Sequence, residues 1–248
     1  MNSTDLKVSI IMPVYKASET IEQAVASVVT QSYYNWELII INDACPEDSC
    51  QVIRDQVINS PQIIQIDNAT NQGVVISRNA GIAHASGSII AFLDSDDYWH
   101  SDKLKCQIVK IEEGYNVVCS NYLRVKPNNV PLQVRHKKEF NFFDMLKSNQ
   151  IGNLTGLYRC DRLGKIYQKN IGHEDYVMWL EIVKRSGSGY CVQEPLAYYR
   201  ISNKSLSANK FRAITWQWYI YRKELNFSLI FSIWLFLNYL FNALKKRA

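Results

Sequence analysis

The sequence predicts an α/β fold built on an open, doubly wound and mostly parallel sheet. Two observations carry this prediction. Between residues 8 and 121, short apolar runs rich in β-branched residues alternate with segments whose apolar residues recur with the period of a helix. The runs are apolar throughout, without polar alternation, and such strands are typical of parallel sheets that helices cover on both faces.

The first half contains four expected strands with helices between them. We expect strands at 8–14, 36–42, 63–66 and 89–93, and helices at about 21–29, 49–58 and 74–85. In the first helix, one face is formed by apolar residues spaced three and four apart, namely Ile21, Ala24, Val25 and Val28. This order gives the β-α-β-α-β-α-β pattern of a wound sheet.

From about residue 122 the regular pattern ends. Residues 126–131 contain two prolines and two asparagines and are expected to form a loop or hairpin. A helix is expected from about 173–175 to Arg185, because cations occupy its last turn and Gly187 follows. A strand is expected at 195–200.

The C-terminal segment 227–244 is almost wholly apolar and is followed by Lys245, Lys246 and Arg247. As a helix of about 18 residues it would reach roughly 27 Å, slightly short of a bilayer core of about 30 Å. Its Trp, Tyr and Asn residues and the adjacent cations favour a helix lying in the interface of an anionic membrane. Packing on the globular domain or on a dimer partner, and a true membrane span, are the alternatives.

Composition excludes some classes of function. A net charge of +5 and a pI near 8.8 suit an acidic small ligand or an anionic membrane surface. They are too weak to indicate nucleic acid, and the sequence has no nucleic-acid-binding motif. The six cysteines show no C-x-x-C spacing, and no apolar segment follows a basic one at the N-terminus. We therefore expect reduced thiols and a protein on the cytosolic side.

The acidic tetrad Asp94-Ser95-Asp96-Asp97 directly follows the apolar run 88–93. Three carboxylates in four residues at a strand end concentrate negative charge that a divalent cation would relieve. The carboxyl edge of an open α/β sheet is also where ligands bind. The alternative is a solvated turn that precedes a helix. A calcium loop is excluded because Trp99 and Lys105 occupy the positions that require Gly and Glu.

The first strand end lacks a glycine-rich phosphate loop. It reads Met-Pro-Val-Tyr-Lys (12–16), whereas phosphate-binding and dinucleotide-binding loops need several glycines after the strand. A diphosphate ligand would therefore be held in another way. Bridging by Mn²⁺ or Mg²⁺ fits, because such an ion takes one or two carboxylates and fills its other positions with phosphate oxygens and water.

The ordered motifs together resemble the GT-A inverting glycosyltransferases of family 2. They read Val-Ser-Ile-Ile-Met-Pro-Val-Tyr (8–15), Leu-Ile-Ile-Ile-Asn-Asp (38–43), Asn-Gln-Gly (71–73) with Arg-Asn-Ala-Gly (78–81), Phe-Leu-Asp-Ser-Asp-Asp (92–97) and His-Glu-Asp (173–175). The resemblance covers about residues 7–207. It implies a Rossmann-like GT-A catalytic domain over 1–207, with a nucleotide-binding half at about 7–121 and an acceptor-binding half at about 122–207. Residues 208–248 would then form a helical, membrane-associating segment.

The resemblance also implies a nucleotide-sugar site. Its expected members are Pro13, Val14, Tyr15, Asp43, Asn71, Arg78, Asp94, Ser95 and Asp96. Asp96 is the expected direct metal ligand, and Asp94 would contact the ribose or the metal. Without the resemblance, Asp43 reads equally well as a turn residue and Arg78 as a surface arginine. Asp97 is expected to cap the helix that starts near Ser101.

Asp175 resembles the family's general base, which takes the proton of the acceptor hydroxyl. On its own, the Glu174-Asp175 pair would read as carboxylates that favour a helix N-terminus. Further contacts to acceptor or diphosphate are expected from Glu174, Trp179, Arg200 and Lys204, although core packing is the better interpretation for Trp179. Ser202 stands near the place where many relatives have a histidine, which puts a third protein ligand for the metal in doubt.

The resemblance implies transfer of a hexose from a UDP-sugar, with glucose or galactose type expected, to a polyprenyl-diphosphate-linked saccharide. Such enzymes build bacterial O-antigens, capsules or teichuronic acid. We expect a peripheral protein on the inner face of the cell membrane, and pairing of two copies is a further expectation. The alternative is a non-catalytic member that binds nucleotide sugar or acts as a scaffold in a polysaccharide assembly complex. The intact acidic motifs argue against that alternative.

Overall fold

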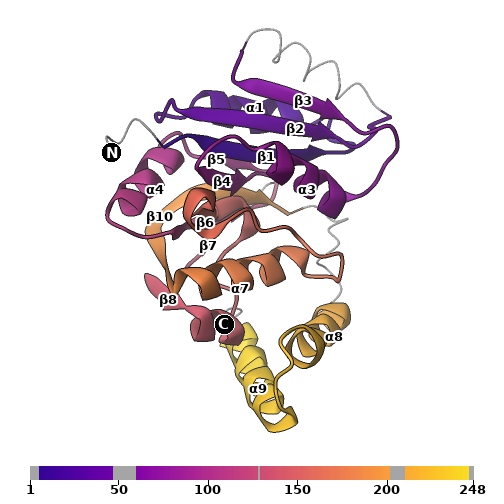
Figure 1. Ribbon diagram of the computed structural model, residues 1–248, viewed down its shortest axis with the longest axis vertical. Helices are drawn as coiled ribbons and strands as arrows, with labels where there is room; N and C mark the ends of the chain where they lie inside the picture. The colour runs from indigo at the N-terminus through magenta and orange to yellow at the C-terminus, as the bar shows by residue number, and fades with distance from the viewer. Residues whose placement is uncertain (1–5, 47–59, 128, 202–209, 246–248) are drawn as a thin grey trace.

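The computed structural model describes residues 6–46, 60–127, 129–201 and 210–245 (Figure 1). One sheet runs through the molecule in the order β3-β2-β1-β4-β9-β6-β10-β5, with β7 paired to β6 and β8 to β10. The strands are β1 (Val8–Val14), β2 (Trp36–Asn42), β3 (Ile63–Asp67), β4 (Ile89–Phe92), β5 (Tyr98–Trp99), β6 (Val117–Val125), β7 (Leu132–Val134), β8 (Glu139–Asn141), β9 (Leu157–Arg159) and β10 (Ser188–Arg200).

Helices cover both faces of the sheet. They are α1 (Ile21–Val29), α3 (Val74–His84), α4 (Lys103–Glu112), α5 (Phe142–Lys147), α6 (Cys160–Leu163), α7 (Glu174–Ser186), α8 (Lys210–Tyr219) and α9 (Leu229–Lys245), with a short 3-10 turn at Asn153–Thr155 and a π-helical turn at Ile220–Glu224. The expected helix at 49–58 lies wholly outside the described part of the chain.

The strands of the predicted parallel sheet are confirmed. β2, β1 and β4 pair in parallel, with Val8 opposite Trp36 and Ile11 opposite Phe92, and β3 pairs in parallel with β2. Every residue of β1, β2 and β4 is buried. Alternate residues serve different faces, because Ile10 packs in the core with α1 and α4 whereas Ile11 packs in the core with α3 and α7.

The second half of the sheet is mixed. β9 lies antiparallel between β4 and β6, and β10 runs parallel to β6 before its end pairs with the edge strand β5. The predicted loop or hairpin at 126–131 joins the antiparallel strands β6 and β7. The boundary expected near residue 121 falls inside β6, so one strand serves both halves. The division into halves stays a prediction.

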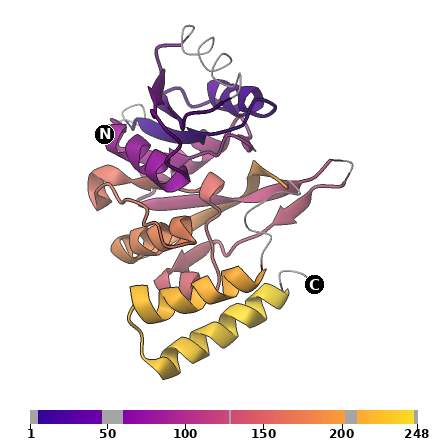
Figure 2. The same ribbon diagram turned by 90° about the vertical axis from the view of Figure 1, so that its right-hand side faces the viewer.

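The C-terminal helices form a pair that lies side by side beyond α7 (Figure 2). Trp218 of α8 packs against Phe236 of α9, with ring centroids 5.6 Å apart at 81°. Leu235 of α9 is fully buried, and α9 packs against α5. The opposite face of α9 is exposed, with Ile230 84% and Leu237 60% accessible. Among the described residues, no helix is both long and apolar enough to cross a bilayer.

A buried lysine anchors α4 under the sheet. Lys103 is fully buried, its Nζ donates a 2.8 Å hydrogen bond to Gln107 Oε1, and it lies 3.9 Å from the ring centroid of Trp99. Gln107 in turn donates to the backbone oxygen of Thr155 at 2.8 Å. Burial disfavours the charged ammonium and lowers the pKa of Lys103 to about 7.

Replacing Lys103 by Met should therefore stabilise the protein most at pH 7 and below. Between about pH 7 and 10.5 the unfolded chain holds a proton on Lys103 that the folded chain does not, so wild-type stability rises with pH by at most about 1.4 kcal/mol per unit. The Met variant lacks this penalty, and its advantage should shrink as pH rises. Denaturant unfolding at pH 7 and pH 9.5 measures the difference, with the exposed Lys105→Met as control. An advantage that does not change with pH would contradict the account.

Candidate active site

The sheet brings the predicted strand-end residues to one edge. Because β1, β2 and β4 are parallel neighbours, Tyr15, Asp43 and Asp94 all follow strands at the same carboxyl edge. The Asp43 N–H donates to the backbone oxygen of Val14 at 2.9 Å, which joins two of these ends. Val14 is fully buried within β1 and Pro13 is also buried, whereas Tyr15 is 44% exposed.

Asp43 fixes the loop that leads into α3. Its carboxylate is buried and accepts hydrogen bonds from Asn68 Nδ2 at 2.8 Å and from the backbone N–H groups of Gln72 and Gly73 at 2.9 and 2.8 Å. Burial raises the pKa of Asp43, but these hydrogen bonds outweigh it and leave the pKa lowered. Asn71 donates to the Asp43 backbone oxygen at 3.3 Å. The Asp43 carboxylate thus holds the polar groups of this loop at the carboxyl edge of the sheet.

A glycine lets α3 approach the sheet closely. A methyl group on Gly81 would lie 2.6 Å from Ile11 Cγ2 and 2.8 Å from Ile41 Cδ1, closer than side chains pack. Without that group, α3 lies directly on β1 and β2. Arg78, one turn earlier on the same helix, therefore reaches the end of β4.

Arg78 forms the central ion pair of the edge. Its Nη2 lies 2.6 Å from Asp94 Oδ1, and the two side chains are 8% and 30% exposed. Its Nη1 donates to Gln168 Oε1 at 3.3 Å. The backbone of Gln168 is held by the Asn79 amide, which donates to its oxygen at 2.9 Å and accepts from its N–H at 2.8 Å. Sequence reasoning missed Gln168, because it stands in a coil outside every motif.

The charges of the two carboxylates of α7 act on the same guanidinium. Burial lowers the pKa of Arg78, but the Asp94 contact, and with it the charges of Asp175 and Glu174, outweigh burial and leave the pKa raised. Glu174 and Asp175 occupy the first turn of α7 and are half-buried. The chain enters this turn through His173, whose φ of 50° is left-handed. Asp175 and the acidic turn, residues 94–97, therefore belong to one electrostatic cluster, although about eighty residues separate them in sequence.

The acidic turn has the donor set of a cation site. The surface of Asp96 is accessible to solvent, but the surrounding atoms partly desolvate its carboxyl group, and this desolvation, followed by the charge of Asp94, raises its pKa. A cation would relieve the repulsion between the two carboxylates. Within the described ranges no three His, Cys, Asp or Glu side chains gather as a protein-only metal site. Two carboxylates nevertheless fit an ion that also takes phosphate oxygens and water. Ser95, between them, is buried.

The expectation that Asp97 caps a helix is wrong. Helix α4 begins at Lys103 after Asp102, and no side chain caps it. Asp97 is buried instead, and its Oδ1 accepts a 2.9 Å hydrogen bond from the Arg200 N–H. Burial, followed by the charges of Asp96 and Asp94, raises the pKa of Asp97 to about 9. The carboxyl group therefore joins β10 to the acidic turn.

Arg200 also holds this turn through its side chain. Its Nη1 donates to the Asp96 backbone oxygen at 2.9 Å, its Nη2 donates to Gln23 Oε1, and its guanidinium lies 4.9 Å from the ring centroid of Tyr98. Lys204 and Ser202, which the sequence places a few residues later, lie outside the described residues.

Trp179 does not meet the expectation that it contacts the acceptor. It is fully buried, its Nε1 donates to Asn153 Oδ1 at 3.2 Å, and it packs edge-on against Phe92 and Tyr158. A tryptophan on the inward face of α7 supports the helix that carries Asp175. The inward spacing of α7 already indicated this role.

Comparison with known proteins identifies relatives over nearly the whole chain. The model of the family "Glycosyl transferase family 2" matches residues 9–167. The chain is 32% identical over 244 residues to a putative teichuronic acid biosynthesis glycosyltransferase, TuaG, of Bacillus subtilis, covering 97% of each chain. It is 33% identical over 248 residues to the UDP-Glc:alpha-D-GlcNAc-diphosphoundecaprenol beta-1,3-glucosyltransferase WfgD of Escherichia coli, covering 98% of this chain and 96% of the relative.

Solved structures share the fold at low sequence identity. S. aureus TarS 1–349 in complex with UDP superposes with a TM-score of 0.73 and 18% identity, covering 95% of this chain and 71% of that one. The mannosyltransferase PcManGT of Pyrobaculum calidifontis, in complex with GDP-Man and Mn²⁺, gives a TM-score of 0.66 and 15% identity, covering 89% and 64%. The fold is thus that of GT-A glycosyltransferases, and the chain is an enzyme that belongs to glycosyl transferase family 2.

Proposed function

We propose that the enzyme transfers a hexose of the glucose or galactose type from a UDP-sugar, with inversion, to a polyprenyl-diphosphate-linked saccharide. The product would enter a bacterial surface polysaccharide such as an O-antigen, a capsule or teichuronic acid. One observation carries the proposal: Arg78 pairs with Asp94 at the end of β4 and lies within electrostatic reach of Asp175. The names of the relatives from B. subtilis and E. coli support the class of product and of acceptor.

In the proposed reaction Asp175 is the general base. Its carboxylate accepts the proton of the acceptor hydroxyl while that oxygen forms a bond to the anomeric carbon of the donor sugar. The bond from that carbon to the diphosphate oxygen breaks at the same time, and UDP leaves with the electron pair. Arg78 holds Asp94 in place. Its positive charge also offsets the negative charge of the neighbouring carboxylates.

The nucleotide would lie along the carboxyl edge of β1, β2 and β4. The residues proposed to line it are Pro13, Val14, Tyr15, Asp43, Asn71, Arg78, Asp94 and Ser95. Asp96, with Asp94, would hold Mn²⁺ or Mg²⁺, and that ion supplies stabilisation of the charge on the departing diphosphate. The Mn²⁺ complex of PcManGT supports a divalent ion in this fold.

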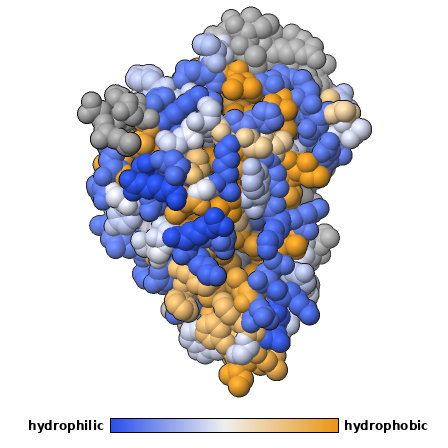
Figure 3. All heavy atoms as spheres, viewed as in Figure 1, coloured by the Kyte–Doolittle hydropathy of each residue, from blue (hydrophilic) through white to orange (hydrophobic). Residues whose placement is uncertain are grey.

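The C-terminal segment, about 208–248, is proposed to hold the enzyme on the inner face of the cell membrane. Figure 3 shows apolar residues gathered at the end of the molecule where α8 and α9 lie. Ile230, Ile233, Trp234 and Leu237 of α9 are exposed at 45% or more. Lys147 lies 5.3 Å from the ring centroid of Trp234, so a cation borders this apolar face, as in helices that lie in an anionic interface. Pairing of two copies stays a prediction.

Replacing Asp175 by Asn should lower kcat by roughly 10²- to 10⁴-fold, because an amide does not accept the acceptor proton. The affinity for UDP should stay close to that of wild type. Steady-state UDP release and UDP titration measure the two quantities. Glu181→Gln, later on α7 and paired with Arg185 outside the site, is the matched control and should keep most of the activity. Wild-type turnover by Asp175→Asn would rule out Asp175 as the base.

Replacing Asp96 by Asn should remove the contribution of Mn²⁺ to UDP binding. In the wild type, UDP with Mn²⁺ should raise Tm more than UDP alone, because the ion bridges carboxylate and diphosphate. Asp97→Asn is the control, since an amide oxygen still accepts the hydrogen bond from the Arg200 N–H. An Asp96→Asn variant with the full Mn²⁺-dependent shift would contradict the metal assignment.

Charged residues on the exposed face of α9 should release the protein from membranes. Ile230→Asp with Leu237→Asp should reduce sedimentation with vesicles that contain anionic lipid, because buried carboxylates oppose insertion into the interface. Val130→Asp is the control, since Val130 is 92% exposed on the loop between β6 and β7. Unchanged vesicle binding, or a loss of self-association without a loss of vesicle binding, would count against the membrane role of α9.

A further inference from the structure

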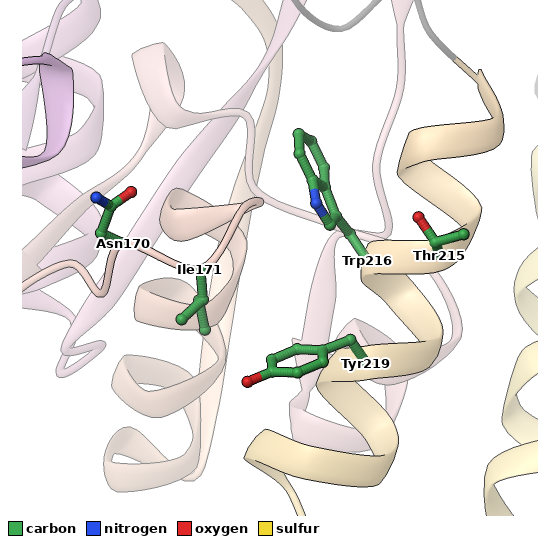
Figure 4. A pocket seen from close by; sticks show the side chains of 5 residues that line it. All are labelled: Asn170, Ile171, Thr215, Trp216 and Tyr219. Carbon is green, nitrogen blue, oxygen red and sulfur yellow. The ribbon is translucent and has the colours of Figure 1, made fainter.

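A pocket away from the carboxyl edge of β1, β2 and β4 opens between α8 and the segment that precedes α7 (Figure 4). Its volume is about 430 Å³, within the range of small-ligand sites. It is lined by Asn170, Ile171, Thr215, Trp216 and Tyr219. No step of the transfer derived above uses these residues.

The lining combines aromatic rings with polar groups. Trp216 and Tyr219 point from α8 toward the segment that carries Asn170 and Ile171. Tyr219 is 43% exposed, and Asn170 is also exposed. A pyranose ring has faces of C–H groups and a rim of hydroxyls, so an aromatic ring covers its face while an amide binds its rim. The pocket therefore has the chemistry of a sugar subsite.

The pocket adjoins the chain segment that leads into the first turn of α7, where the proposed base lies. The Trp216 indole covers Gly172 so closely that a methyl group there would lie 2.5 Å from Trp216 Cε2, and its ring centroid is 5.0 Å from that of His173. His173 directly precedes Glu174 and Asp175 at the start of α7. The segment is also fixed to the C-terminal helices, because Lys169 Nζ lies 2.7 Å from Glu224 Oε2.

Helix α8 connects this pocket to α9. Trp216 contacts the segment before α7, and Trp218, two residues later, packs on Phe236 of α9. A lipid-linked acceptor must place its lipid at a membrane and its sugar at the base. The packed pair of α8 and α9 offers a surface for each.

We propose that this pocket is an acceptor subsite, in which a pyranose ring of the lipid-linked saccharide stacks on Tyr219 and Trp216 and meets the amide of Asn170. The inference rests on the proposed function, because it presupposes a saccharide acceptor and Asp175 as the base. It adds specific acceptor contacts from α8 that lie outside the family motifs.

The test is steady-state kinetics with a soluble acceptor probe. A panel of UDP-sugars with Mn²⁺ first identifies the donor that the wild type uses with α-GlcNAc diphosphate carrying a short alkyl chain. With that donor saturating, Tyr219→Ala should raise the acceptor KM roughly tenfold, which corresponds to about 1.4 kcal/mol of lost binding. Tyr219→Phe keeps the ring and should keep the wild-type KM. Hydrolysis of the donor without acceptor, and the shift of Tm by UDP, should not change in either variant.

Two further variants separate stacking from general damage to the helix pair. Trp218→Ala removes an indole from the α9 side of α8 and should leave the acceptor KM unchanged. Asn170→Ala lies on the opposite wall of the pocket and should raise the acceptor KM without touching either helix. An unchanged KM in both Tyr219→Ala and Asn170→Ala, or an equal rise in Trp218→Ala, overturns the subsite while the proposed function stands. If the wild type releases UDP with none of the donor and acceptor pairs in the panel, the proposed function itself is overturned, and the subsite with it.

Discussion

The ion pair between Arg78 and Asp94 is the interaction on which the site depends. A guanidinium that is 8% exposed requires its anion, and a buried charge left without its partner costs about 3–5 kcal/mol. Arg78 reaches Asp94 because Gly81 lets α3 lie directly on β1 and β2. The pair thereby fixes the end of β4 relative to α3. The negative charges of Glu174 and Asp175 on α7 also stabilise the Arg78 cation.

The mixed half of the sheet brings distant residues to the same edge. β9 inserts antiparallel beside β4, and β10 returns parallel to β6 until its last residue, Arg200, meets the acidic turn. Asp97 and Arg200 thus join segments about a hundred residues apart. Beneath α7, Trp179 packs on Phe92 of β4, so the helix that carries Asp175 and the strand that leads to Asp94 share one core contact.

Apolar pattern and motif order predicted much of this arrangement. The strands of the parallel half were predictable because full burial requires continuous apolar runs, and α7 was predictable because its inward face repeats every three to four residues. The pattern did not predict β9, a three-residue strand, or the role of Gln168, since neither has a local signature. Asp97 was misassigned because a carboxylate before a helix reads as a cap, whereas its partner comes from β10.

In the proposed function, the acidic turn and Asp175 of α7, acting as the base, form one site for direct displacement at the anomeric carbon. A single displacement by a hydroxyl that Asp175 deprotonates inverts the configuration of that carbon. The most direct measurement is NMR of the glycosidic bond in the product made from an α-linked UDP-hexose. Direct displacement yields a β-linked product, and an α-linked product would rule it out.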